Sequence, residues 1–188
     1  MKIKLLNLFF ILTVVFQISC SSDDDGTASE TDAELAGEWE MISYNYVGST
    51  SAESFGIPIK IDYTGEATEI DVSITIDEDP NIMTAMGSYT IKLTTNVGGQ
   101  SSTQSYPFED IATTSTFERE GDELIVETSL FNSSQGLELG TEVLEAPLVI
   151  EELTEDSLIL TSKVQQTVEQ EGVEFTVKLD IEQEYIRK

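Results

Sequence analysis

Apolar residues recur at every second position through most of this chain. The clearest case is the segment 173–187, where apolar residues alternate with Glu, Thr, Lys and Asp. The same period of two runs through 55–63, 70–76, 89–97 and 158–168. This period is typical of β-strands that bury one face and expose the other, whereas a helix would repeat every 3.6 residues. The pattern therefore predicts an all-β body.

Turn signals join these segments into hairpins. Gly121-Asp122 separates 114–120 from 123–130, and Gln170-Glu171-Gly172 precedes the last strand. With further strands expected over 38–47 and 146–153, the chain contains about eight to ten strands and no helix after its first residues. Many antiparallel strands favour a barrel or a sandwich, and full closure would remove the exposed edges. Two polar segments, 98–104 and 132–136, are predicted to be loops.

The first nineteen residues have a different pattern. Lys2 and Lys4 precede an apolar run over 5–18, and the only cysteine, Cys20, follows. The run is shorter than the roughly 20 residues of a membrane-spanning helix, and it matches a secretory signal peptide. The segment resembles a lipobox, which implies cleavage after residue 19 and lipidation of Cys20. The alternative is a cleaved secreted protein with an incidental thiol.

An acidic tether is expected over residues 20–34. Ser21-Ser22-Asp23-Asp24-Asp25 resembles the lipoprotein export signal of Bacteroidetes, which implies an outer-membrane lipoprotein exposed on the cell surface. A periplasm-facing lipoprotein is the alternative. Two or more acyl chains would anchor the protein firmly, so the membrane is an expected partner through the lipid alone.

Charge and composition narrow the possible functions. Without residues 1–19 the chain has 7 basic and 36 acidic side chains, a net charge of −29, and it has no histidine. Binding to nucleic acid needs clustered Lys and Arg, so it is excluded. Catalytic pairs of Ser or Cys with His are excluded too, and we expect no enzyme activity and no cofactor. Acids at 77–79 resemble a calcium loop, but Ile82 and Ser88 stand where its glycine and glutamate belong, so a hairpin turn is predicted.

Both ends of the body carry a family resemblance. Leu35-Ala36-Gly37-Glu38-Trp39 and the terminal Tyr185-Ile186-Arg187 resemble the lipocalin-like domain lipoproteins of Bacteroidetes. The resemblance covers 35–188 and implies a lipocalin-like, antiparallel up-and-down β-barrel. It also implies that Trp39 closes one end of the barrel, with Arg187 packed across its ring and Gly37 permitting the entry into the strand. Such a cation–π pair contributes about 0.5–2 kcal/mol.

A ligand site is expected inside this barrel. Its candidate residues are the non-apolar side chains at positions expected to point inward: Ser43, Asn45, Ser162, Gln166, Gln183 and Tyr185. We expect a monomeric, surface-anchored protein that binds a small or lipid-like molecule, hydrophobic or amphipathic. The alternative is a filled barrel whose loops contact glycan or protein through aromatic residues around Tyr44, Tyr46, Phe55 and Tyr106. A cavity of a few hundred Å³ would favour the first function.

Overall fold

The computed structural model describes residues 33–54, 57–128, 130–131, 146–170 and 173–188. All of them belong to one compact unit, residues 32–188. Cys20, the tether up to residue 32 and Phe55 lie outside the described residues, as does the predicted loop 132–136.

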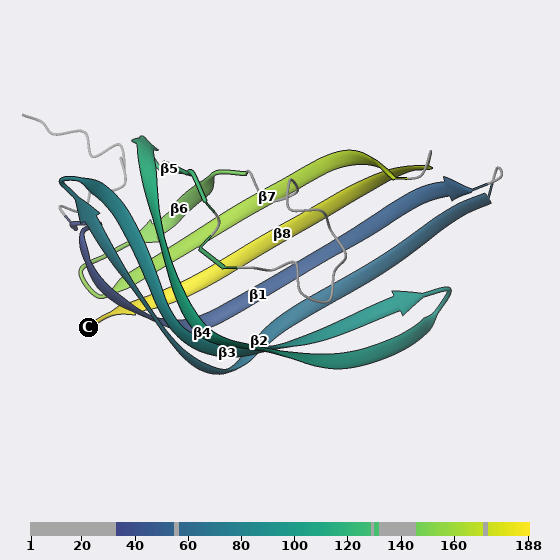
Figure 1. Ribbon diagram of the computed structural model, residues 1–188, viewed down its shortest axis with the longest axis horizontal. Helices are drawn as coiled ribbons and strands as arrows, with labels where there is room; N and C mark the ends of the chain where they lie inside the picture. The colour runs from purple at the N-terminus through teal and green to yellow at the C-terminus, as the bar shows by residue number, and fades with distance from the viewer. Residues whose placement is uncertain (1–32, 55–56, 129, 132–145, 171–172) are drawn as a thin grey trace, which may run out of the picture. The chain divides into compact units, whose positions relative to one another are not determined.

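Eight antiparallel strands form the body, and each pairs with its neighbours in chain order to make a closed barrel (Figure 1). This confirms the all-β, up-and-down barrel and the lower of the expected strand numbers. The described part of the chain contains no helix. The strands are β1 (Gly37–Ser54), β2 (Ile57–Glu78), β3 (Asn81–Val97), β4 (Gln100–Glu120), β5 (Glu123–Val126), β6 (Leu148–Leu153), β7 (Ser157–Gln170) and β8 (Val173–Arg187).

The alternation in the sequence becomes an apolar interior and a mainly polar outer wall. On β8, Val177, Leu179 and Tyr185 are each 1% exposed, while Asp180 and Glu182 between them, and Glu174 before them, are exposed. No charged side chain is buried among the residues that the structure describes. The core is therefore held together by burial of apolar side chains, at about 25 cal/mol for each Å² removed from water.

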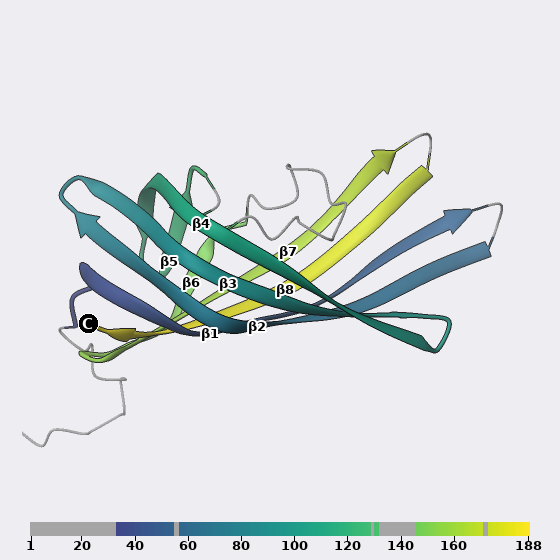
Figure 2. The same ribbon diagram turned by 60° about the horizontal axis from the view of Figure 1, so that its bottom comes forward.

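The two ends of the barrel differ because β5 and β6 are short. β4 pairs with β5 only over Phe117–Glu120, and two residue pairs join β5 to β6. Residues 100–115 of β4 and 162–170 of β7 have no second strand beside them among the described residues. We call the end with all eight strands the closed end. The hairpin end is the opposite end, where the β1–β2, β3–β4 and β7–β8 hairpins project (Figure 2).

A bulge in β1 changes which residues face inward. Met41 pairs with Tyr185, but the next pair joins Ser43 to Glu184, so the alternation slips by one residue. Trp39 and Met41 before the bulge are buried, and so are Tyr44 and Tyr46 after it. Asn45 pairs with Glu66 and Glu182 on the outer wall. The expectation that Ser43 and Asn45 point into the barrel is therefore wrong, because an inserted residue shifts a strand by one face.

The loop that polar composition predicted over 98–104 is wrong for most of its length. Only Gly98 and Gly99 form the turn, and β4 begins at Gln100. The polar side chains bond across the hairpin instead: Thr94 Oγ1 lies 3.0 Å from Thr103 Oγ1, and Asn96 Nδ2 donates to Ser101 Oγ at 3.2 Å. Such cross-strand pairs stabilise a sheet without apolar contacts.

Other expected turns are present, with small differences in length. Asp79 and Pro80 separate β2 from β3, Gly121 and Asp122 separate β4 from β5, and residues 154–156 separate β6 from β7. The strand expected over 123–130 ends at Val126. Of the segments expected over 55–63 and 70–76, the described residues 57–63 and all of 70–76 lie in one strand, β2, which has a register shift between Thr68 and Asp71.

Candidate functional site

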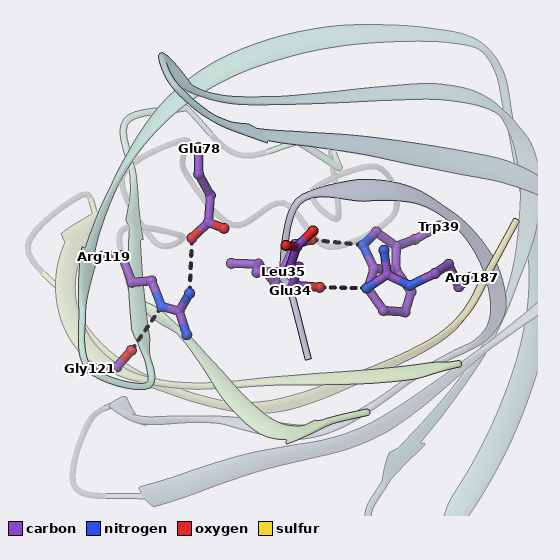
Figure 3. Close-up of polar contacts among 7 residues, drawn as sticks. All are labelled: Glu34, Leu35, Trp39, Glu78, Arg119, Gly121 and Arg187. Atoms are coloured by element: carbon purple, nitrogen blue, oxygen red, sulfur yellow. Dashed lines mark hydrogen bonds and ion pairs between the residues drawn. The ribbon is translucent and has the colours of Figure 1, made fainter. Parts of the chain in front are cut away.

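The closed end is sealed by Trp39 and Arg187. Trp39 is fully buried, and the guanidinium carbon of Arg187 lies 4.1 Å from the centroid of its ring (Figure 3). The cation–π contact expected from the sequence is thus confirmed. Gly37 has φ of +148°, and a side-chain Cβ there would collide with Arg187 Nη1. Only glycine combines this backbone conformation with the close approach of the guanidinium.

Arg187 also ties three parts of the chain together. It donates from Nη1 to Ala36 O at 3.0 Å, from Nε to Glu155 O at 2.7 Å, and from Nη2 to Glu34 O. Trp39 Nε1 donates to Leu35 O at 3.0 Å, so the ring is fixed at its polar edge as well (Figure 3). All three guanidinium nitrogens and the indole nitrogen thus donate to backbone carbonyls of the chain itself, as expected of a structural seal.

A second arginine bridges the closed end at its surface. Arg119 Nη1 lies 2.9 Å from Glu78 Oε1, and its Nε donates to Gly121 O at 3.1 Å (Figure 3). The pair links the end of β2 to the β4–β5 turn. Both side chains are partly exposed, and an ion pair of this kind contributes about 0–1 kcal/mol.

A chain of aromatic rings fills the middle of the barrel. Tyr89 stacks on Phe108 with ring centroids 4.7 Å apart, and Tyr44 meets Tyr89 edge-on at 5.7 Å. The chain continues to Tyr46 at 6.2 Å and from there to Tyr63 at 6.5 Å. Tyr44 and Tyr46 are buried here and are not part of exposed aromatic loops, contrary to the alternative considered from the sequence.

Two glycines make room for two of these rings. Tyr46 pairs with Gly65, and Gly48 pairs with Tyr63, across β1 and β2. A Cβ on Gly65 would collide with the Tyr46 ring, and one on Gly48 would collide with the Tyr63 ring. Each tyrosine ring therefore lies across the glycine with which it is paired on the neighbouring strand. The signal in the sequence is a repeated Tyr-x-Gly, at 46–48 and 63–65, which antiparallel pairing turns into two reciprocal contacts.

Burial raises the pKa values of four interior tyrosines and so favours their protonated form. It raises the pKa of Tyr46 to about 12, and it raises the pKa values of Tyr63, Tyr89 and Tyr185 as well. Tyr63 Oη donates to Lys178 O at 3.3 Å, and Tyr185 Oη donates to Gln183 Oε1 at 2.9 Å. Tyr89 Oη differs: within the described part of the chain it is the one buried side-chain polar atom that has no hydrogen-bond partner.

Two hollows adjoin this aromatic chain. The inner one has a volume of about 60 Å³ and is lined by Tyr44, Phe131, Ser162 and Gln183 among others. It has room for a few waters but lies well below the roughly 300 Å³ of a typical ligand pocket. A second hollow of about 260 Å³ lies between Tyr89, Phe108 and Thr113, along the edge of β4 that has no second strand among the described residues. Leu130 lines both hollows.

The apolar inner face continues past the closed ring and becomes exposed. Along β2, exposure rises from 3% at Tyr63 to 45% at Ile59 and 65% at Ile57, all on the same face. On β3 it rises from 3% at Leu93 to 48% at Val97. An apolar surface that faces water at the mouth of a barrel marks a place where a ligand or partner can bury it.

The predicted site residues divide between three places. Ser162 and Gln183 line the inner hollow, and Tyr185 is buried with its hydroxyl on Gln183. Gln166 is half-buried on β7, where it pairs with Val177. Asn45 donates to Ser43 Oγ at 2.8 Å and lines a shallow groove outside the barrel, beside Asp180 and Glu182. The barrel interior thus brings together three of the six predicted ligand-site residues, namely Ser162, Gln183 and Tyr185.

The described ranges hold neither a metal-binding cluster nor a membrane-spanning helix. No group of three or more acidic, His or Cys side chains is placed to hold a metal ion in the described ranges. The described residues also include no helix that is long and apolar enough to cross a membrane.

Comparisons with known proteins do not place the chain in a family. No protein-family model matches it, and no curated protein matches it. Among solved structures, a weak likeness is found to the crystal structure of Ail, the attachment invasion locus protein of Yersinia pestis. The TM-score is 0.21 at 9% identity, over 82% of this chain and 100% of that chain, and a score this low carries no inference about fold or function.

Proposed function

We propose that this protein is a monomeric lipoprotein on the outer face of the outer membrane. Its lipocalin-like barrel binds a small or lipid-like molecule, without catalysis. The lipid on Cys20 would hold the barrel at the surface, and the ligand would lie against the inner face of the hairpin end.

The observation that carries the binding proposal is the apolar inner face at Ile57, Ile59 and Val97, which stays exposed at the hairpin end. Exposed Ile and Val side chains at the mouth of an apolar interior cost free energy in water, and an apolar ligand would recover about 25 cal/mol for each Å² that it covers. The aromatic chain below them would form the floor of the site. The inner hollow of about 60 Å³ is too small to hold the whole ligand, so the proposal places it toward the hairpin end.

Support for the anchor comes from the sequence alone. The leader ends at the only cysteine, and the acidic run follows it directly. Replacing Cys20→Ala should move the protein from the membrane fraction of its host to the soluble fraction, and labelling with a radioactive fatty acid should disappear. Continued partition of the Cys20→Ala chain with outer-membrane lipid would contradict lipid anchoring.

Binding is tested with the full chain carrying Cys20→Ala, so that no detergent competes. Three 12-carbon probes are titrated by calorimetry below their micelle concentrations: 1-monolaurin, laurate and dodecyltrimethylammonium. We expect at least one to bind at a ratio of one to one. Ile59→Glu should weaken that binding about tenfold or more, because a carboxylate would face the apolar chain of the probe.

Met86→Glu is the matched control. Met86 is 58% exposed, but it pairs with Ser73 and Ala112 on the outer wall. It should leave probe binding unchanged. Equal losses in both variants, or no binding of any probe, would contradict the proposal, and the second result would favour the alternative of a module that contacts glycan or protein.

A further inference from the structure

The first residues of β4 are uncovered along one edge of the sheet. Residues 100–106 pair with β3 on one side, and no second strand lies on their other side among the described residues. They lie at the tip of the β3–β4 hairpin, and the side chains of 100–105 are all exposed (Figure 2). We call residues 100–106 the free edge. An uncovered edge presents backbone N–H and C=O groups with which another extended chain can pair.

The geometry of the hairpin turn shows which backbone groups point away from β3. The hairpin closes with Val97 paired to Gln100 across a two-residue turn. The residues that flank such a turn hydrogen-bond to each other, and the pairs along the hairpin then alternate between bonded and non-bonded. The N–H and C=O groups that point outward from the free edge therefore belong to alternate residues, which are Ser101, Thr103 and Ser105.

Pro107 is the next residue in this series and agrees with it. It pairs with Thr90, so its backbone nitrogen also points away from β3. Proline has no N–H group, and within sheets it occurs at edges where that group would face solvent. The proline therefore removes no hydrogen bond between β3 and β4, and it marks the position at which the outward donors of the free edge end.

The rest of the β4 edge is protected against pairing, whereas the free edge is not. Natural sheets block their edges with proline, charged side chains and bulges. All three follow residue 106: Pro107 comes first, and Glu109 and Asp110 then lie within a register shift. Residues 100–106 contain none of these features.

The uncovered edge of β7 is protected by charge. Residues 162–170 also have no second strand beside them among the described residues, but they include Lys163 and Glu169. By contrast, residues 93–108 contain no charged side chain, although charged residues make up 24% of the chain. Of these two uncovered edges, only the free edge of β4 is open to another strand.

We propose that the free edge binds an extended segment of a partner protein, which adds to the sheet as a strand beside β4. This interface is separate from the proposed ligand site. Main-chain hydrogen bonds to Ser101, Thr103 and Ser105 would supply the affinity, as in other peptides that add to a sheet edge. Two copies of this chain would repel each other instead, since 36 acidic side chains outnumber 9 basic ones.

Charge and alternation define the sequence that the segment should have. Beside residues 100–106 it would be uncharged, and every second side chain would be apolar because it faces the barrel interior. A lysine or arginine would lie beside Glu109 and Asp110, which are both exposed. The partner segment is therefore a basic residue or two followed by an alternating apolar and polar run.

The test uses the full chain carrying Cys20→Ala and a fluorescent peptide of two lysines followed by four Val-Thr repeats. Fluorescence anisotropy should show saturable binding. Two further peptides carry N-methyl groups on every valine or on every threonine nitrogen. Because N–H groups of alternate residues point to opposite edges of a strand, one form should bind like the parent and the other at least tenfold more weakly. Equal binding of the two forms, or no binding of the parent peptide, would overturn the proposal.

A pair of variants tests the edge from the side of the protein. Thr103→Pro removes the central outward N–H and should weaken peptide binding at least tenfold. Thr103→Val is the matched control, because it keeps that N–H and removes only the hydroxyl that lies 3.0 Å from Thr94 Oγ1. It should bind the peptide like the parent chain. Unchanged binding by Thr103→Pro would overturn the proposal, and so would equal losses in both variants.

Two measurements complete the test. The melting temperatures of both variants should match that of the parent chain, since the N–H of residue 103 makes no hydrogen bond to β3; if Thr103→Pro unfolds, the two N-methylated peptides decide the question with the parent chain. Sedimentation of the parent chain without peptide should show a monomer. A dimer that Thr103→Pro dissociates would overturn the proposal by showing that a second copy occupies the free edge.

Discussion

The closed end and the hairpin end of this barrel are built from the same strands with the same alternation. They differ in how completely their inward side chains are buried and hydrogen-bonded. At the closed end Trp39 is fully buried and Arg187 uses its guanidinium on one ring and three carbonyls. At the hairpin end Ile57, Ile59 and Val97 lie on the inner face but remain largely exposed. Inward orientation alone therefore does not bury a side chain.

The difference follows from β5 and β6, which have four and six residues. Where they complete the ring, each inward side chain meets others from the opposite wall. Beyond them β4 and β7 have no further strand alongside in the described residues, so that the six long strands continue with one wall missing. In such a barrel, most of the stabilising contacts lie at the closed end, and an apolar surface is exposed at the hairpin end.

The largest effect is expected at the closed end. Trp39→Ala removes a fully buried ring and leaves Arg187 without its cation–π partner. We expect a loss of about 3–5 kcal/mol in the free energy of unfolding, measured by urea denaturation. Ile57→Ala, a truncation at the hairpin end, should cost less than about 0.5 kcal/mol. Similar losses in the two variants would remove the distinction between the ends.

Alkaline pH should produce an intermediate effect through the tyrosines between the two ends. The pKa of Tyr46 rises to about 12 in the folded barrel, from 10 in the unfolded chain. Above pH 10 the unfolded chain loses this proton while the folded barrel keeps it. Stability is therefore fully present below pH 10 and falls as the pH rises toward 12, by up to about 2 kcal/mol for Tyr46 alone.

Urea denaturation at pH 8, 10, 11 and 12 measures this loss. Tyr63, Tyr89 and Tyr185 also have raised pKa values and add to the fall in the same direction. Tyr46→Phe should make the decline shallower, since one titrating group is gone. A wild-type stability that does not change between pH 10 and 12 would show that these hydroxyls are not shielded from water.

The smallest effect on stability is expected for Ile59→Glu, the variant that should abolish most probe binding. Its side chain is 45% exposed before substitution, so the free energy of unfolding should change by less than about 0.5 kcal/mol. A chain that keeps its stability and loses its ligand would locate binding at the hairpin end. A loss of several kcal/mol would mean that Ile59 belongs to the core instead.

The sequence predicts strands better than it predicts their register. Alternation over 173–187 correctly places Val177, Leu179 and Tyr185 inside. It fails for Ser43 and Asn45, since the bulge in β1 moves the inward positions from odd to even numbers. The only mark of this in the sequence is the spacing of three between Met41 and Tyr44, which interrupts the period of two. Polar composition, in turn, fails over 100–104, where Ser, Thr and Gln indicated a loop but pair across the β3–β4 hairpin.

Within the barrel interior, the sequence identified polar residues that line the inner hollow, but it did not identify the unpaired hydroxyl of Tyr89. Ser162 and Gln183 are recognisable as polar residues within apolar strands, and both line the inner hollow. Tyr89 was not singled out, because a tyrosine in an alternating strand looks like any other core residue. Its distinguishing property is an absent partner, and that depends on what the opposite strands bring within reach of the hydroxyl.

By itself, the sequence determined the all-β body and its apolar inner face, because these follow from a period of two. The barrel and the pairing of Trp39 with Arg187 were implied by the family resemblance at the two ends of the body, and the structure bears both out. The tertiary structure alone decided where the ring closes and which inward residues reach water. It also decided which hydroxyl goes unpaired. Those features depend on contacts between strands far apart in the chain, and the period of one strand carries no information about the length or register of its neighbours.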